Sequence, residues 1–384
     1  MKNILIAIRS IFKKGRHNVM KIVSLGIGLA VGLVLIAKVY FEQSYDDFYP
    51  DRDRVYQVWA KYQQNGGELK DYPQTSGGIA PTMQQQIPEI ETVTRYTSFG
   101  DWTFTMTDTK MKYSGRCIIA DSCFFDILPR PMLIGNAKEV LSIPMYVLVS
   151  SRIAKNIGGD VIGKNFTVDS SPGRTMTIGG VFEEVPENSH SRYDVIVSMA
   201  SAGRFMWEGS PTNMLGNDRY ISYVKLHKGV NPLALEEQVH TFVNSYFPPE
   251  EQQKTGFNIG FSFHELDGLH KELPQVKRMT WILSLLAFAL IFTAVMNYIL
   301  IVISSIVNRS KEVAVHKCYG ASENNIHGMM FGEALVHIVL SLILALLLIL
   351  AFRGTVEELL ATSLDSLLLS NGSLVLLGIC ILVF

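Results

Sequence analysis

The sequence predicts a membrane protein in which an α-helical transmembrane bundle carries a large α+β extracytoplasmic domain with an inserted β-rich subdomain. Apolar runs at residues 22–40, 281–307 and 329–352 are each long enough to cross a bilayer core, which takes about 20 helical residues. More than half of the chain lies between the first two runs and has the mixed composition of a water-soluble domain. A fourth run at 374–384 is too short to span, so we expect three complete spans and an incomplete fourth.

The overall composition agrees with this division. Mean hydropathy is +0.21 and 48% of the residues are hydrophobic, yet 18% are charged, which is too many for a chain buried wholly in lipid. The net charge of −1 argues against nucleic acid as a partner, because no basic excess is present to release counterions. Cys117 and Cys123 fall in the extracytoplasmic part, where they form either a disulfide or two unpaired thiols.

The N-terminal residues predict a surface helix followed by the first span. Residues 1–21 carry six Lys or Arg residues and no acidic one, with apolar residues at helical spacing, as in a basic amphipathic helix on the cytoplasmic membrane surface. Residues 22–41 predict an uncleaved span, because the run is longer than a signal-peptide core and leads into a bulky acidic segment. Ser24, Gly28 and Gly32 recur every fourth residue. These small residues form a helix face without large side chains. This face either lets a second helix approach closely or reflects the ordinary glycine content of a span.

Alternation of the spans sets the expected topology, with the N-terminus and the basic segment before the third span in the cytoplasm. The expected segments are an extracytoplasmic domain at 42–276 (β-rich subdomain at about 112–215), a second span at 278–307, a cytoplasmic segment at 308–328, a third span at 329–352, an outer loop at 353–371 and the start of a fourth span at 372–384. The last apolar run covers about 16 Å at 1.5 Å per residue, so we expect this sequence to end inside a span.

Short patterns predict the elements of the outer domain. Alternation of apolar and polar residues predicts strands at 55–62 and 220–226. Between them, a section of short strands broken by Gly and Pro is expected at 112–120, 145–149, 166–168 and 175–182. Helical spacing predicts helices at 80–87 and 233–246, the second opening after Asn231-Pro232.

No pattern in the outer domain predicts an active site. Gly158, Gly163 and Lys164 match a GxxxxGK phosphate loop, but Asn165 replaces the hydroxyl residue that binds magnesium, and a strand pattern follows where a helix is required. The histidines lack metal-ligand spacing and are expected to be solvated or packed. The two glutamates of PEIETV (residues 88–93) are better explained as a solvated edge than as paired catalytic carboxylates. We therefore expect no catalytic residue, metal or cofactor.

The cytoplasmic segment, RSKEVAVHKCYGAS at 309–322, is the most informative stretch. Lys311-Glu312 and His316-Lys317 lie four to five residues apart, which places charge along a short helix, and Gly320 is well placed to end it. Apolar residues between the charges favour a helix that packs on the bundle and meets a partner; the alternative is a polar loop that only fixes topology. Glu333, just inside the next run, either pairs with Lys311 or Lys317 or reaches to the membrane interface.

This segment resembles the cytoplasmic signature of MacB/FtsX-type ABC transporter permeases, RxKEIGIRKxxGAS followed by FxxEA. His316 stands in place of the usual Arg, and Val313 and Val315 in place of Ile. Phe331–Ala334 matches the second part, with Glu333 as its acidic residue, and Asn297 matches an Asn of the second span. Blocks of the outer domain resemble consecutive blocks of a MacB-like periplasmic core domain, at 44–58, 88–96, 123–136 and 179–190, and GGDVIGKNF matches one more.

The resemblance covers nearly the whole chain and is to the first half of the long Bacteroidetes-type permeases, in which the four-span unit is repeated. It implies a non-enzymatic, multi-pass protein of the bacterial inner membrane with a periplasmic core domain and an FtsX-like transmembrane domain. A separate ABC ATPase subunit is expected to grip the residues that match the signature, namely Arg309, Lys311, Glu312, His316, Lys317, Gly320 and Ala321. Bundle packing is expected of Ser24, Gly28, Gly32, Asn297 and Glu333.

The family implies mechanotransmission, in which ATP-driven closure of the ATPase changes the conformation of the periplasmic domain. Further partners implied are a second permease half or a homodimer, membrane lipid and, for exporters, a periplasmic adaptor and an outer-membrane channel. Family roles include efflux of antimicrobials, peptides or lipophilic substrates, with antimicrobial resistance as a result; control of a cell-wall hydrolase, as in FtsX; and lipoprotein release. The large outer domain favours efflux, whereas a membrane-anchored enzyme lacks any catalytic constellation to support it.

Overall fold

The computed structural model describes residues 18–318 and 323–368, which divide into two compact units. The membrane unit comprises the described residues up to Ser44 and from Lys271 onward, and the outer unit is Tyr45–His270. The expected amphipathic helix and the start of the fourth span lie outside the described residues, apart from residues 18–21, which are helical.

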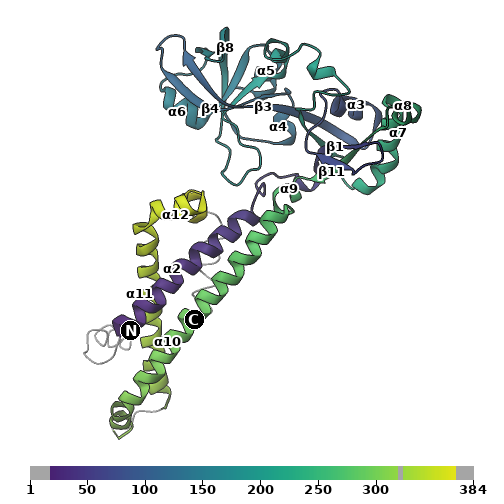
Figure 1. The fold of residues 1–384 in the computed structure, drawn as a ribbon. Coiled ribbons are helices and arrows are strands. Elements are labelled where there is room, and N and C mark those ends of the chain that lie inside the picture. Colours follow the sequence, from purple (N-terminus) through teal and green to yellow (C-terminus); the bar gives the residue numbers. More distant parts are fainter. Residues whose placement is uncertain (1–17, 319–322, 369–384) are drawn as a thin grey trace. The chain divides into compact units, whose positions relative to one another are not determined.

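Long helices form the membrane unit. Three described helices are long and apolar enough to cross a membrane: α2 (Asn18–Gln43), α10 (Pro274–Cys318) and α11 (Glu323–Ala351). Figure 1 shows α2 lying alongside α10 and α11. Two short helices, α12 (Arg353–Leu360) and α13 (Leu364–Leu368), occupy much of the stretch that we expected as an outer loop. The core between the helices is apolar, with Leu25, Leu29, Ala345 and Ile349 buried.

One mixed sheet organises the outer unit. Its strands among the described residues are β1 (Val55–Gln64), β2 (Lys70–Tyr72), β3 (Ile90–Met106), β4 (Lys112–Ala120), β5 (Met132–Ile134), β6 (Tyr146–Ser150), β7 (Asn165–Val168), β8 (Ser171–Phe182), β9 (Val195–Ser198), β10 (Ile221–Leu226) and β11 (Phe257–Glu265). The order is β11-β1-β10-β3-β4-β9-β6-β8-β5, with β2 on β1 and β7 on β3 and β8. Only β4–β9 and β6–β8 pair in parallel. Every strand predicted from the sequence is present, and so are both helices, whereas β2, β3, β5, β9 and β11 had no prediction.

Short helices cover the sheet. They are α3 (Ile79–Gln86), α4 (Phe124–Ile127), α5 (Ala137–Ser142), α6 (Ser151–Ile157), α7 (Glu236–Tyr246), α8 (Pro249–Thr255) and α9 (Gly268–Lys271), together with 3₁₀ turns at Arg52–Arg54, Met199–Arg204, Ser210–Thr212 and Pro232–Leu235. Between β4 and β8 both sheet faces are buried, because successive residues such as Val147 and Leu148 enter separate apolar clusters. The strands there accordingly read as continuous apolar runs. At the other end, α3 and α7 pack on one face of β1 and β10.

Candidate functional site

The signature residues lie at the end of an unbroken helix. α10 runs for 45 residues, and its stretch Pro274–Ser304 is long and apolar enough to cross a membrane. Arg309, Lys311, Glu312, His316 and Lys317 occupy the last turns of the same helix, whereas Gly320 and Ala321 lie outside the described residues. Residues 309–318 are therefore helical, but they continue the helix of the second apolar run instead of forming a separate short helix. At 1.5 Å per residue, 45 residues make a rod of about 67 Å.

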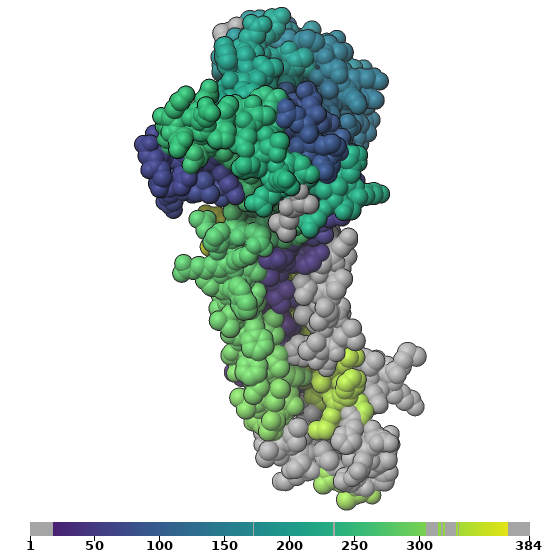
Figure 2. Space-filling view, turned by 90° about the vertical axis from the view of Figure 1, so that its right-hand side faces the viewer, coloured from purple at the N-terminus to yellow at the C-terminus, as the bar shows by residue number. Residues whose placement is uncertain are grey.

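The glycine face of α2 is where α10 lies against it. A Cβ built on Gly28 would clash with the Cβ of Ala294, and one built on Gly32 would clash with the side chain of Ile291. Gly26, which the sequence analysis passed over, faces α11 instead, with the Leu344 side chain 2.9 Å from its ideal Cβ. Small residues thus bring α2 close to both neighbouring helices (Figures 1 and 2).

This close approach predicts a compensating pair of substitutions. Gly28→Ala is expected to destabilise the membrane unit by about 1–3 kcal/mol, because the added methyl overpacks the contact with Ala294. Ala294→Gly removes the opposing methyl, so the double variant is expected to recover most of the loss. Thermal denaturation in detergent measures both effects, and a double variant no more stable than Gly28→Ala would contradict this contact.

Polar side chains are buried inside the bundle. Tyr298 of α10 and Glu333 and His337 of α11 are enclosed, with the Tyr298 and His337 rings 6.2 Å apart. Lys21 of α2 is 2% exposed, and its Nζ donates to Asn18 Oδ1 at 3.5 Å. Glu333 is thus held within the helices and is not extended to their surface.

One hydrogen bond between α11 and α2 shows that His337 and Lys21 lie at the same end of the bundle. Ser341 Oγ donates to the Ile22 carbonyl at 3.1 Å, one turn beyond His337 and one residue beyond Lys21. Ionisable groups buried in a membrane bundle are costly and usually functional. Asn297, by contrast, is exposed. Its role in packing stays a prediction, since it would need contacts with residues that the structure does not describe.

A buried ion pair holds the other end of α2. Lys38 Nζ lies 2.7 Å from Glu42 Oε1, and the two side chains are only 10% and 6% exposed. Lys38 also donates to Thr362 Oγ1 at 2.8 Å, which ties α2 to the turn between α12 and α13. This pair was not predicted, although the i, i+4 spacing of Lys38 and Glu42 is the signal in the sequence that points to it.

The chain enters the outer unit through a buried aspartate. Asp46 is fully buried and has a left-handed backbone, with φ +60°. Its carboxylate accepts hydrogen bonds from Ser189 Oγ (3.0 Å) and the backbone N–H of His190 (3.3 Å), and it lies 2.7 Å from His190 Nδ1. The other ring nitrogen of His190 is 2.5 Å from the Tyr223 hydroxyl on β10. The first residues after α2 are thereby fastened to the middle of the sheet.

Two of the recognised sequence blocks meet in this network. Asp46 belongs to the block at 44–58 and His190 to the block at 179–190. The Tyr96 hydroxyl, from the block at 88–96, is 2.6 Å from Ser191 Oγ, and burial raises the pKa of Tyr96 to about 12. His190 was expected only to be solvated or packed; the structure shows it packed and hydrogen-bonded.

The two chain connections to the membrane unit leave the outer unit close together. Tyr45 and His270 stack with ring centroids 3.4 Å apart and planes 7° apart. Arg52 pairs with Asp47 at 2.5 Å and with Asp267 at 3.2 Å. Residues next to the two crossing points are therefore joined directly to each other within the outer unit.

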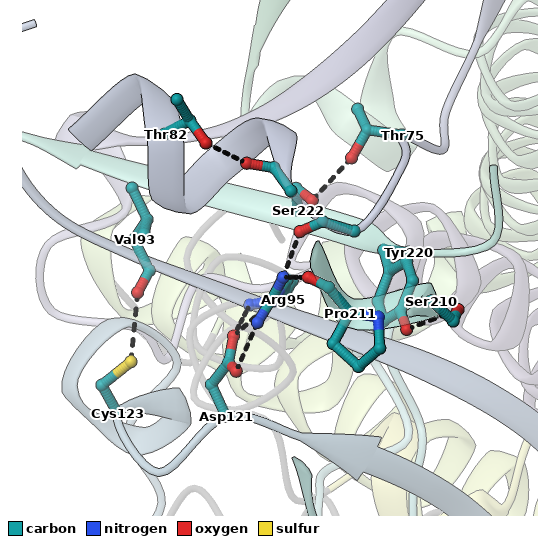
Figure 3. A network of polar contacts seen from close by, with 12 residues as sticks. Thr75, Thr82, Val93, Arg95, Asp121, Cys123, Ser210, Pro211, Tyr220 and Ser222 are labelled. Atoms are coloured by element: carbon teal, nitrogen blue, oxygen red, sulfur yellow. Dashed lines mark hydrogen bonds and ion pairs between the residues drawn. The ribbon is translucent and has the colours of Figure 1, made fainter. Parts of the chain in front are cut away.

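A second polar network, around Arg95 of β3, joins three loops (Figure 3). The guanidinium pairs with Asp121 (Nε to Oδ2, 3.1 Å) and donates to the carbonyls of Gly77 and Pro211. It also lies over the Tyr220 ring at 5.6 Å. Because Arg95 is largely buried and fully engaged, its role is to hold these loops on the sheet.

The expected absence of a phosphate loop agrees with the local geometry. Gly158 follows α6, Gly163 donates to the Ile178 carbonyl, and Asn165 begins β7, so a strand stands where a phosphate-binding helix would be needed. Lys164 Nζ donates to the Gly158 carbonyl at 3.2 Å.

Two further sequence expectations concern cysteines and metals. Cys117 and Cys123 are free thiols, and burial raises the pKa of both. Within residues 18–318 and 323–368, no group of three His, Cys, Asp or Glu side chains could hold a metal ion.

Comparisons with known proteins agree with this arrangement. Residues 20–242 match the family model of the MacB-like periplasmic core domain, and residues 284–384 match that of the FtsX-like permease C-terminal domain. The chain is 32% identical to the solved domain of a putative permease protein from Porphyromonas gingivalis, with a TM-score of 0.52, over 56% of this chain and 91% of that one.

More distant similarity extends to two other solved domains. The periplasmic region of MacB from Actinobacillus actinomycetemcomitans is 14% identical, with a TM-score of 0.39, over 57% of this chain and 92% of that one. The extracellular domain of the noncanonic ABC-type transporter YknZ from Gram-positive bacteria is 10% identical, with a TM-score of 0.38, over 54% and 98%. No curated protein matches the chain. Because the first family model covers more than half of its length, this chain belongs to the MacB/FtsX-type ABC transporter permeases.

Proposed function

We propose that this permease converts ATP hydrolysis by a separate ATPase subunit into a conformational change of its outer unit, for efflux of antimicrobials, peptides or lipophilic substrates. The observation that carries the proposal is the continuity of α10, which begins at Pro274, next to the outer unit in the chain, and extends to the signature residues. A helix without a break transmits displacement along its length, because its backbone hydrogen bonds resist bending.

The close packing of α2 and α10 supports the same path. With no side chain at Gly28 or Gly32 to separate them, a shift of α10 moves α2 with it. Both helices are connected in sequence to residues that are fastened inside the outer unit, Asp46 through His190 and Tyr45 through His270. Displacement of the helix pair would therefore reach the sheet through these fastened residues.

The energy for this change must come from a partner. MacB/FtsX-type permeases work with an ATPase in ABC transporters and are normally non-catalytic themselves. A change of shape follows only from a difference in binding free energy between two states, which ATP binding and hydrolysis in the partner would supply.

Charge reversal at the signature tests the grip of the ATPase. Lys311→Glu together with Lys317→Glu is expected to lower the amount of ATPase subunit that co-purifies with the permease at least tenfold, because like charges then replace complementary ones. The matched control is Lys277→Glu, which reverses an exposed lysine near the other end of α10. Equal recovery of the ATPase with the unchanged permease, the double variant and Lys277→Glu would argue that the signature residues do not bind the ATPase.

The alternatives differ in the partner outside the membrane. A cell-wall hydrolase that crosslinks to the outer unit would favour an FtsX-like regulatory scaffold, whereas a periplasmic adaptor would favour efflux. One observation favours lipophilic cargo, including a released lipoprotein: α2, α11 and α12 border an open hollow of about 500 Å³ lined by apolar side chains such as Val31, Ile349, Phe352 and Leu359.

A further inference from the structure

Two short helices connect the end of α11 with α2. α12 begins at Arg353, only one residue after α11 ends at Ala351, and Figure 1 shows it turning away from the end of α11. α13 packs against α2, and its Leu364 and Leu367 side chains are 2% and 1% exposed. Residues 353–368, which we call the strap, thus reach from α11 across to α2.

Contacts within the strap hold its two helices in one arrangement. Glu357 Oε1 of α12 accepts hydrogen bonds from Arg353 Nε and from the backbone N–H of Leu364, both at 2.9 Å. The Arg353 guanidinium also donates to Asp365 Oδ2 at 3.0 Å. The turn between the helices has a left-handed backbone at Ala361, with φ +48°. Single exposed ion pairs add little stability, but this connected set fixes the geometry of the turn.

The turn of the strap is fastened to a buried lysine of α2. Lys38 Nζ donates to Thr362 Oγ1 at 2.8 Å, and Thr362 in turn donates to the Leu360 carbonyl at 2.9 Å. Lys38, Glu42 and Thr362 are 8%, 4% and 6% exposed, and Glu42 Oε1 lies 2.7 Å from the lysine nitrogen. Because these groups are buried, a strap that left α2 would take away one acceptor of a charged donor, which is costly.

This contact lies at one end of the apolar hollow between α2, α11 and α12. Val34 and Leu35 of α2 line the hollow, and Lys38 follows them by four and three residues, so it lies on the same helix face one turn further on. On the strap, Leu360 lines the hollow and Thr362 comes two residues later. The bond between Lys38 and Thr362 therefore sets the separation of the α2 and α12 walls at that end.

We propose that Lys38 is a positioning residue, which fastens the strap to α2 so that the adjoining ends of α2 and α11 move together when the ATPase acts. The inference rests on the proposed function for the source of the movement. Gly28 and Gly32 let α10 carry α2 with it, and the strap would pass that shift on to the end of α11. Coupling of this kind travels through packed side chains and hydrogen bonds, and the hollow would keep its width throughout.

Electron spin resonance can measure whether the two helix ends move together. Nitroxide labels are placed at Val31→Cys on α2 and Phe352→Cys at the end of α11, which are exposed side chains on two walls of the hollow. The sample is the full permease–ATPase complex in lipid nanodiscs, with the four native cysteines replaced by alanine. With the strap intact we expect one narrow distance distribution, whose mean is the same with and without ATP.

Substitutions at the contact release the strap. Thr362→Val removes the hydroxyl and leaves the Lys38–Glu42 pair in place. It is expected to widen the distribution at least twofold and to make its mean depend on ATP. Thr362→Ser keeps the hydroxyl and is the matched control, with a narrow distribution that ATP does not change. Lys38→Met combined with Glu42→Gln breaks the contact from α2 without stranding a carboxylate, and should behave as Thr362→Val does even if that variant folds poorly.

The measurements separate this inference from the proposed function. A mean distance that shifts with ATP in the unchanged complex would overturn the inference, as would a Thr362→Val distribution that matches Thr362→Ser. A distribution that widens but stays independent of ATP would leave Lys38 as a static brace, which also contradicts it. Hydrogen–deuterium exchange on the same samples reports the outer unit. An outer unit of the unchanged complex that does not respond to ATP would contradict the proposed function, while the width without ATP still decides whether Lys38 fastens the strap.

Discussion

Replacing Asp46 with alanine is expected to destabilise the outer unit by about 3 kcal/mol, because hydrogen bonds to a charged carboxylate and buried donors left unsatisfied each count for about 1–3 kcal/mol. The carboxylate is completely buried and receives hydrogen bonds from Ser189 and His190, so its loss leaves several buried donors without an acceptor. The left-handed backbone at φ +60° adds to the cost, because alanine disfavours that region.

The Asp46→Asn variant separates the loss of the hydrogen bonds from the cost of the left-handed backbone. Asp46→Asn keeps one acceptor oxygen and tolerates the left-handed backbone, so we expect a smaller loss of about 1–2 kcal/mol. Asp108→Ala, at an exposed turn, is the control and should change stability by less than about 0.5 kcal/mol. Unfolding of the full chain in detergent, followed by tryptophan fluorescence, measures all three. An Asp46→Ala midpoint that matches Asp108→Ala would show that the buried network does not fasten the chain.

A proline at residue 306 is expected to uncouple the ATPase from the outer unit. Residue 306 follows the apolar stretch Pro274–Ser304 and precedes Arg309, where the signature begins. Proline removes a helical hydrogen bond and clashes with the preceding turn, at a cost of about 3 kcal/mol, so that the helix kinks or breaks there. We expect ATPase capture to stay within twofold, since the signature is intact, while the ATP-dependent change in the outer unit falls at least tenfold.

Hydrogen–deuterium exchange of the permease–ATPase complex, with and without ATP, measures that change. Ile306→Ala is the matched control, because it alters the same position and leaves the helix continuous. Should the proline variant respond to ATP as strongly as the alanine variant, transmission along α10 would be ruled out.

The candidate site was only partly visible in the sequence. The signature and the glycine spacing of α2 are local patterns, so they could be recognised without coordinates. The Asp46–His190 contact joins residues 144 positions apart, and no local pattern marks either residue as a partner of the other. Asn297 was singled out by resemblance, yet it is the adjacent Tyr298 that is buried between the helices.

Two of the strands that had no prediction, β3 and β11, lie where the sheet bends or ends. β3 runs for 17 residues but carries Gly100 at φ +72° and a shift of register with β4, so its pattern changes face midway. β11 has side chains that are partly exposed on both faces, which weakens any contrast between buried and solvated positions.

By itself the sequence determined the apolar runs long enough to span a membrane, the outer domain of mixed α and β elements and the family, because hydropathy and motif spacing are properties of neighbouring residues. The tertiary structure alone decided that the second apolar run and residues 309–318 form one helix, that Asp46 is held by His190, and that β11 pairs only with β1 among the described strands. Each of these depends on which distant segments pack together, since burial and strand pairing arise only when the chain is folded.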